Sequence, residues 1–173
     1  MSLFTELAGC FAEAAVDYVL IGGHAVNVWA EPRFTADIDF TVRSDPDALG
    51  RLRALLEADG WTVERVHGEG LPSGPDFVRF VHPDHDSPVE LQTAKTGYQQ
   101  TLIERAVAHE DVGGLTVATP EDLLVLKLIA FRAKDRGDLA ALAALDGLDW
   151  PYVERWAAIW EVEDRLRRIR APE

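Results

Sequence analysis

The sequence predicts an α+β fold in which a mixed sheet is flanked by helices, with a helical C-terminal part. Short β-rich runs and helical patterns alternate up to about residue 118, whereas only helical patterns follow. The 173 residues are 47% apolar and 27% charged, which suits a globular domain with a sizeable core. We therefore expect an α+β core over 1–118, with the helical part 119–173 packed on it.

The first half of the chain begins with apolar residues at helical spacing and then turns to β-rich runs. "YVLI" stops at Gly22-Gly23, and "DIDFTV" alternates polar and apolar residues as a half-buried strand does. Pro46 suits the first turn of a helix, and Gly60 suits its end. The expected elements are a helix over 2–15, a strand over 18–21, a helix over 24–29, a strand over 37–42, a helix over 46–60 and a strand over 61–66.

The second half begins with a loop over 67–76 and ends in helices. Thr119 is a good helix cap, with Pro120 and Glu121 in the first turn after it. A bend is expected near Gly137. The expected elements are strands over 77–82 and 88–94, a helix over 98–108, a strand over 114–118, a helix over 120–145 and a last helix over 150–170.

Composition excludes several classes of protein. The formal net charge of −13 repels polyanions, so we expect no broad nucleic-acid binding. Cys10 is the single cysteine and forms no internal disulfide, which fits a reducing cytoplasm. The sequence has no apolar run of membrane-spanning length and no signal-peptide pattern at its start, so we expect a cytoplasmic protein without a membrane partner.

Two aspartates two residues apart, Asp37 and Asp39, are the first candidate functional pair. On a strand they point to the same face, where two unpaired carboxylates repel each other. A divalent cation between them would relieve that repulsion, and Mg²⁺ takes carboxylates together with substrate phosphates. The alternative is a solvated strand edge with incidental acids.

The second candidate feature is the Gly22-Gly23 turn between a strand and a helix. Glycine lets the backbone approach a ligand closely, and the free N–H groups of a helix start attract phosphate. A structural tight turn is the alternative. His24 either contacts the ligand or only caps the helix. A phosphate-binding turn beside a metal-binding carboxylate pair is what nucleotidyl transfer needs.

The stretch "GGHAVNVWAEPRFTADIDF" (22–40) resembles the signature of the nucleotidyltransferase superfamily of the DNA polymerase β type. It is most similar to the minimal bacterial AbiEii-type and MenT-type toxin nucleotidyltransferases, whose pattern Arg33, Thr35, Asp37 and Asp39 match. "PEDLLVLKLIAFRAKDRGDLAAL" (120–142) resembles the lysine-bearing helix of the same group. About a quarter of the chain carries the similarity, which implies a nucleotidyltransferase-like mixed sheet.

The resemblance also implies a third carboxylate on a later strand, and Glu90 in "PVELQT" fits, with glutamate in place of the family's aspartate. Lys127 lies among apolar residues on a helix face and needs an anionic partner. That partner is either the nucleotide triphosphate or a local acid, and the further alternative is a lysine that extends its ammonium to solvent. Asp135 and Asp138 either orient the basic groups of this segment or form part of a solvated face.

The sequence therefore predicts a nucleotidyltransferase that uses Mg²⁺ or Mn²⁺ to move a nucleoside monophosphate from an NTP to a hydroxyl. Asp37, Asp39 and Glu90 are the expected metal ligands and, with Lys127, the catalytic residues. The expected nucleotide-binding residues are Gly22, Gly23, His24, Arg33, Thr35 and Lys127.

The acceptor is left open between tRNA, protein and a small molecule, and the toxin resemblance implies a cognate antitoxin as a partner. The alternative function is an inactive or weak nucleotidyltransferase-fold module that only binds. A rival interpretation assigns zinc to His82, His85 and Asp86, although a hairpin turn explains the same residues.

Overall fold

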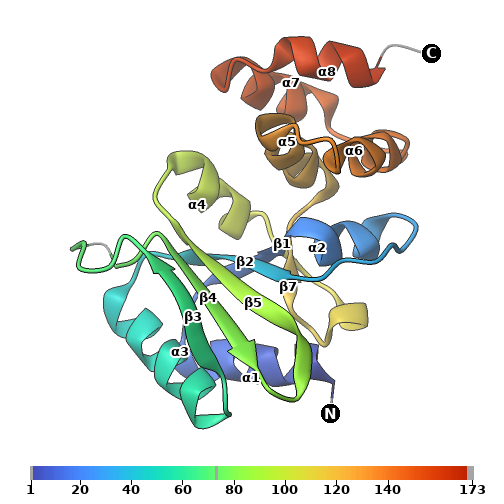
Figure 1. Cartoon of the computed structure of the whole chain (residues 1–173). Helices are drawn as coiled ribbons and strands as arrows, with labels where there is room; N and C mark the ends of the chain where they lie inside the picture. The colour runs from blue at the N-terminus through green and yellow to red at the C-terminus, as the bar shows by residue number, and fades with distance from the viewer. Residues whose placement is uncertain (1, 73, 171–173) are drawn as a thin grey trace.

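The computed structural model describes residues 2–72 and 74–170, and over these residues it contains one seven-stranded mixed sheet (Figure 1). The strands lie in the order β3-β4-β5-β2-β1-β7-β6. They are β1 Tyr18–Ile21, β2 Ile38–Arg43, β3 Thr62–His67, β4 Phe77–His82, β5 His85–Ala94, β6 Val107–Ala108 and β7 Thr116–Val117. β2 pairs antiparallel with β1 and parallel with β5, so two segments far apart in sequence meet at the centre of the sheet.

One face of the sheet is covered by α1 (Leu3–Ala14) and α3 (Pro46–Ala58) (Figure 1). The ring of Phe11 in α1 lies 4.8 Å from that of Phe40 in β2, and both side chains are fully buried. The Asp45 side chain caps α3 by accepting hydrogen bonds from two backbone N–H groups. Part of the apolar core therefore lies between these helices and the sheet.

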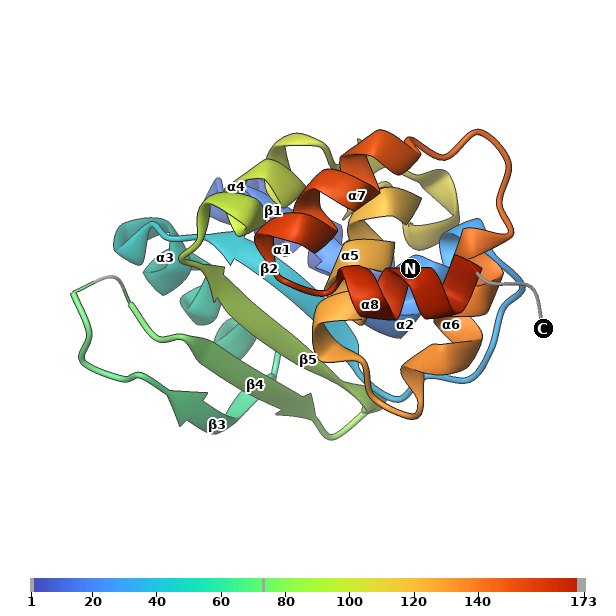
Figure 2. The ribbon, with the colours of Figure 1, turned by 90° about the horizontal axis from the view of Figure 1, so that it is seen from above.

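The other face carries the remaining helices, among them α2 (Gly22–Trp29) and α4 (Gly97–Glu104). The C-terminal helices are α5 Pro120–Ala130, α6 Asp135–Ala143, α7 Trp150–Ile159 and α8 Glu163–Arg170. Seen from above, they gather over one side of the sheet, and β3 and β4 have no helix above them (Figure 2). The polar side chains on this side of β4 and β5 consequently lie at the border between the helices and open sheet.

The predicted fold class is confirmed, and the strand over 18–21 is found as predicted. Two long helices were predicted wrongly. The first breaks at Phe131, not near Gly137, because Phe131 takes a left-handed backbone conformation (φ 44°) that ends α5. The second breaks at Glu161, whose φ is 55°, between α7 and α8.

Smaller differences also appear. The helix expected over 98–108 ends at Glu104, and its last residues form β6 instead. β5 begins at His85, three residues earlier than predicted. The predicted division at residue 118 falls in the link between β7 and α5, and it stays a prediction.

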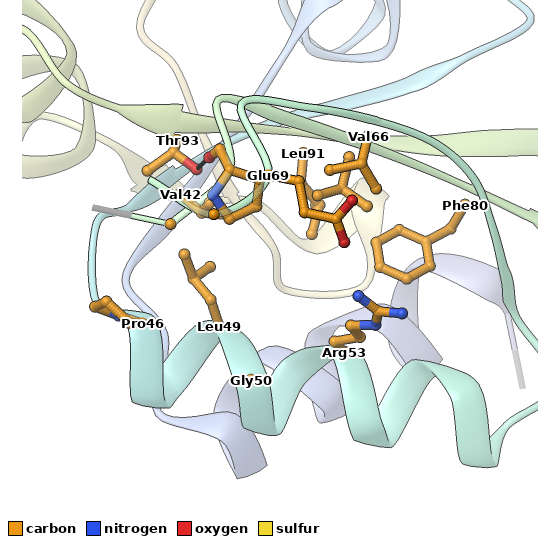
Figure 3. Close-up of a pocket in the computed structure, with 14 residues that line it drawn as sticks. Val42, Pro46, Leu49, Gly50, Arg53, Val66, Glu69, Phe80, Leu91 and Thr93 are labelled. Carbon is orange, nitrogen blue, oxygen red and sulfur yellow. Dashed lines mark hydrogen bonds between the residues drawn. The ribbon is translucent and has the colours of Figure 1, made fainter. Parts of the chain in front are cut away.

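A cavity of about 280 Å³ remains between α3 and the sheet, beneath β3, β4 and β5 (Figure 3). Leu49 and Arg53 of α3 point toward Val66, Phe80 and Leu91 of the sheet. Apart from a few polar groups such as Arg53, its lining is mainly apolar, so this space is a gap in the core packing.

Across residues 2–72 and 74–170, every helix is too short or too polar to cross a lipid bilayer.

Candidate functional site

The turn after β1 has no room for side chains. α2 begins at Gly22, directly after Ile21, and Gly22 has a φ of +70°. A Cβ atom on Gly22 would lie 2.0 Å from Oδ2 of Asp39, and one on Gly23 would lie 2.4 Å from Oγ1 of Thr35. The N-terminus of α2 has no capping side chain, so its first N–H groups are available to a ligand.

Three carboxylates approach this turn, two from neighbouring strands and one from the residue just before the first of them. Asp39 of β2 lies opposite Ile21 of β1 and beside Glu90 of β5. Asp37 comes directly before β2, not within it as predicted. Val89 and Leu91 are buried on the other face, so the predicted alternation around Glu90 is confirmed.

The carboxylates and the glycine turn line one cavity of about 370 Å³. It brings together most of the residues predicted from the sequence. The lining residues are Gly22, Gly23, Arg33, Phe34, Thr35, Ala36, Asp37, Asp39, Glu90, Lys127, Arg132, Lys134 and Asp135.

The electrostatics of the cavity centre on Asp39. Burial is the largest cause that raises the pKa of its carboxyl, and the charge of Glu90, a hydrogen bond with Glu90 and the charge of Asp37 act in the same direction, so that the pKa reaches about 7. Lys134 opposes this rise in the pKa. Near neutral pH the Asp39 carboxyl is therefore partly protonated, and a bound cation would displace that proton.

Lys127 is almost fully buried and pairs with local acids. Its ammonium lies 3.3 Å from Oδ1 of Asp135 and 2.5 Å from Oδ2 of Asp138. Arg33 binds Asp138 through Nε and Nη2, and Arg132 binds Asp135 in the same bidentate way. The local-acid alternative for Lys127 thus describes its present contacts, although the side chain also lines the cavity.

Lys134 and Arg79, for which the sequence predicted no role, also face the carboxylates. Lys134 lines the cavity, and within the described part of the chain it makes no ion pair shorter than 4.0 Å. Arg79 of β4 lies opposite Glu90 and binds both Glu90 and Asp37. Its position in "FVRFVH", between residues of the opposite face, was the signal available in the sequence.

His24 is not brought to the cavity. Its ring packs edge-on against Phe4 with a centroid distance of 5.3 Å, and burial lowers the pKa of the imidazole. The rival zinc interpretation also finds no support. His82 already uses both ring nitrogens, one with the carbonyl of Asp59 and one with the N–H of Asp84.

The donor set suits a hard divalent cation, since it consists of carboxylate oxygens. Gly22 has no side chain that would block access to Asp39. Even so, no group of three or more metal-ligating side chains in 2–72 and 74–170 is arranged to hold an ion. Asp37 is turned to Arg79, and Asp39 shares a hydrogen bond with Glu90. The chemistry of the donors fits Mg²⁺ or Mn²⁺, and binding would require these side chains to exchange partners.

Comparison with solved structures places this arrangement in a known fold. ANT(2")-Ia, in complex with adenylyl-2"-tobramycin, superposes with a TM-score of 0.64 at 17% identity, over 94% of this chain and 97% of that one. The lincosamide antibiotic adenylyltransferase LnuA, lincomycin-bound, gives 0.57 at 16% identity over 80% and 92%. JHP933 from Helicobacter pylori gives 0.54 at 20% identity over 93% and 72%.

These likenesses concern the fold, because every identity is below 25%. No curated protein sequence matches the chain. The family model described as "Nucleotidyltransferase of unknown function (DUF6036)" matches residues 1–168. The superfamily resemblance drawn from the sequence is thereby confirmed, and the chain belongs to this family of nucleotidyltransferases.

Proposed function

We propose that this nucleotidyltransferase moves a nucleoside monophosphate from an NTP to a hydroxyl of a small molecule, with help from Mg²⁺ or Mn²⁺. One observation carries the proposal. Asp37, Asp39 and Glu90 converge on the same cavity as the uncapped start of α2. A triphosphate and its cation need both kinds of group within a few ångströms of each other.

Each group has a chemical task. The N–H groups at Gly22 and Gly23 and the ammonium of Lys134 would bind the triphosphate. A bound divalent ion would supply positive charge to the phosphates and acidify the attacking hydroxyl. Arg33 and Lys127 hold Asp138 from two sides, which fixes the wall of the cavity.

The transfer step balances as an in-line displacement. Glu90 accepts the proton of the acceptor hydroxyl while the hydroxyl oxygen forms a bond to the α-phosphorus. The bond from the α-phosphorus to the bridging oxygen breaks, and pyrophosphate leaves with the electron pair. Glu90 is only partly exposed, with 18% of its side chain accessible, so its carboxylate can act where little water competes.

A small acceptor is favoured over tRNA by two considerations. A chain with a net charge of −13 attracts no polyanion. The similar solved structures LnuA and ANT(2")-Ia are described with lincomycin and with an adenylylated tobramycin. A toxin role with a cognate antitoxin remains a second proposal, carried only by the resemblance of the motif around Asp37 and Asp39.

The test is transfer of label from each α-labelled NTP to hydroxyl-bearing small molecules, with and without Mg²⁺. We expect transfer with Mg²⁺, its loss with a chelator, and a drop of about 10³-fold in Asp39→Asn. Parallel reactions with tRNA distinguish the two acceptor classes. Transfer that Asp39→Asn leaves intact would refute the site, and absence of transfer in the wild type would favour a binding module.

A further inference from the structure

Arg79 occupies the space between the carboxylates. Its Nη1 donates to Oδ1 of Asp37 at 3.0 Å and also to Oε1 of Glu90. Its Nε lies 2.8 Å from Oε2 of Glu64 in β3. One guanidinium therefore connects three carboxylates from three parts of the sheet.

The sheet itself builds this contact. The antiparallel register of β4 and β5 places Arg79 opposite Glu90, and the parallel register of β5 and β2 places Glu90 beside Asp39. The register of β3 and β4 shifts between Val63 and Arg65, which leaves Glu64 out of the regular pairing and free to turn to Arg79.

Arg79 and its partners Glu90 and Asp37 are partly shielded from water. The accessible fractions of the side chains are 22% for Arg79, 18% for Glu90 and 35% for Asp37. Burial opposes the charge of Arg79, yet its hydrogen bond to Glu90 and its attraction to Asp37 raise the pKa of the guanidinium. Arg79 thus carries a permanent positive charge in the centre of the acidic cluster.

We infer that Arg79 is a resident cation that competes with a divalent metal ion for Asp37 and Glu90. This inference rests on the proposed function, which makes these carboxylates metal ligands. An ion held by Asp37 and Glu90 together would lie about 2 Å from their oxygens, in the space that Nη1 fills. Metal entry at that position requires Nη1 to withdraw, while the contact between Nε and Glu64 keeps the side chain anchored.

Direct competition and simple scaffolding predict opposite effects. If Arg79 only held the acids in place, its removal would disorder them and weaken metal binding. If it competes, its removal strengthens metal binding. Arg53 provides a matched control, because it lies on α3 at the opposite face of the sheet and pairs with Glu57. Arg53→Met changes the net charge of the chain as Arg79→Met does.

The experiment is calorimetric titration of the full chain with Mn²⁺ alone, without nucleotide. We expect the affinity of Arg79→Met for Mn²⁺ to be about tenfold higher than that of the wild type, or more. The reason is that the substitution removes a positive charge next to the metal position, at a site that is only partly exposed to water. Arg79→Lys should fall between them, because an ammonium lacks the bridging fork. Arg53→Met should stay near the wild type. Equal affinities in Arg79→Met and Arg53→Met, or weaker binding in Arg79→Met, would overturn the inference.

Thermal unfolding gives a second measure that needs no activity. Without metal, Arg79→Met should melt below Arg53→Met, since its carboxylates are left uncompensated, and Mn²⁺ should close the gap. A gap that Mn²⁺ leaves unchanged contradicts the inference. Failure of the proposed function is separate, because it appears as absence of Asp39-dependent label transfer whatever the Mn²⁺ affinities are.

Discussion

Strands β2, β4 and β5 carry opposite chemistry on their two faces. On one face Asp39, Arg79 and Glu90 lie side by side, and the two carboxylates line a cavity of about 370 Å³. On the other, Phe80 and Leu91 border a cavity of about 280 Å³ against α3. The two chemistries are separated by one residue along each strand, so a change of one position exchanges a reactive group for a packing group.

Each face also has a different relation to its empty space. On the charged face, burial and the neighbouring carboxylates raise the pKa of Asp39. The ionised form of Asp39 is therefore unfavourable there until a cation binds. On the apolar face, the space only removes contacts from the surrounding side chains. We therefore expect changes on the first face to affect binding and transfer, and changes on the second to affect stability.

Among the glycine substitutions, the largest effect should come from Gly22→Ala. The new Cβ would meet Oδ2 of Asp39 at 2.0 Å, and the φ of +70° disfavours any L side chain. We expect label transfer to fall by roughly 100-fold or more, because displacement of about 1 Å at a reacting group has that cost. Initial rates at saturating NTP would measure it, and wild-type rates would show that the turn lies outside the site.

Leu91→Ala should have its main effect on stability. Leu91 is almost fully buried and already borders the cavity, so truncation enlarges a gap that the core does not close. We expect a loss of about 2–4 kcal/mol in the free energy of unfolding, measured in urea. The matched variant changes the preceding residue, Glu90→Gln. It should lose label transfer and largely keep the stability of the fold. The reverse pattern in the two variants would contradict the assignment of the faces.

The pH dependence of stability should identify Asp39. Its pKa is raised from 3.8 to about 7 in the folded protein. Protonated Asp39 therefore contributes its full stabilisation of the fold when the pH is below 3.8, the pKa in the unfolded chain. This contribution is lost as the pH rises through about 7. Urea unfolding without metal between pH 4 and 8 would measure this loss, and Asp39→Asn should remove it. Mn²⁺ affinity should change in the opposite sense, rising with pH as the competing proton leaves.

The smallest effect should come from Gly50→Ala, the counterpart of Gly22→Ala on the apolar side. Gly50 lies within α3, and a Cβ there would meet no atom within 4 Å. Replacing a helical glycine by alanine should stabilise the fold by about 0.5–1 kcal/mol and leave transfer unchanged. Thermal melting and initial rates of the same preparation would check both parts, and destabilisation would mean that α3 lies closer to the sheet than described.

The sequence predicted the parts of the site that depend on local pattern. The strand ending at Gly22, the alternation of "DIDFTV" and the alternation around Glu90 are each readable within a few residues. The fold then brings these short segments together as neighbours in one sheet. For Asp37 the prediction was right about the cavity but wrong about the strand, because the residue lies just outside β2.

The position of Arg79 depends on a register that no local pattern reveals. An uninterrupted hairpin closed by Pro83 and Asp84 would place Pro88 opposite Arg79. The register shifts between Phe80 and His82, and this irregularity places Glu90 there instead. The contact between Arg79 and Glu90 therefore had to come from the structure.

The partners of Lys127 depended on the break after α5. A continuous helix would carry Asp135 and Asp138 away along the helix axis, whereas the left-handed Phe131 returns the chain so that both acids reach the ammonium. A phenylalanine in this conformation has no simple signal in the sequence. The predicted role of Lys127 on the phosphates consequently stays a prediction.

The most direct test of the two-face account is to locate the nucleotide. Backbone amide NMR shifts would be followed while Mg²⁺ and a non-hydrolysable NTP analogue are added to the full chain. The account predicts that the largest shifts fall at Gly22, Gly23, Asp39 and Lys134, which line the charged cavity. Shifts concentrated instead in α3, around Leu49, would place the ligand in the apolar cavity and contradict it.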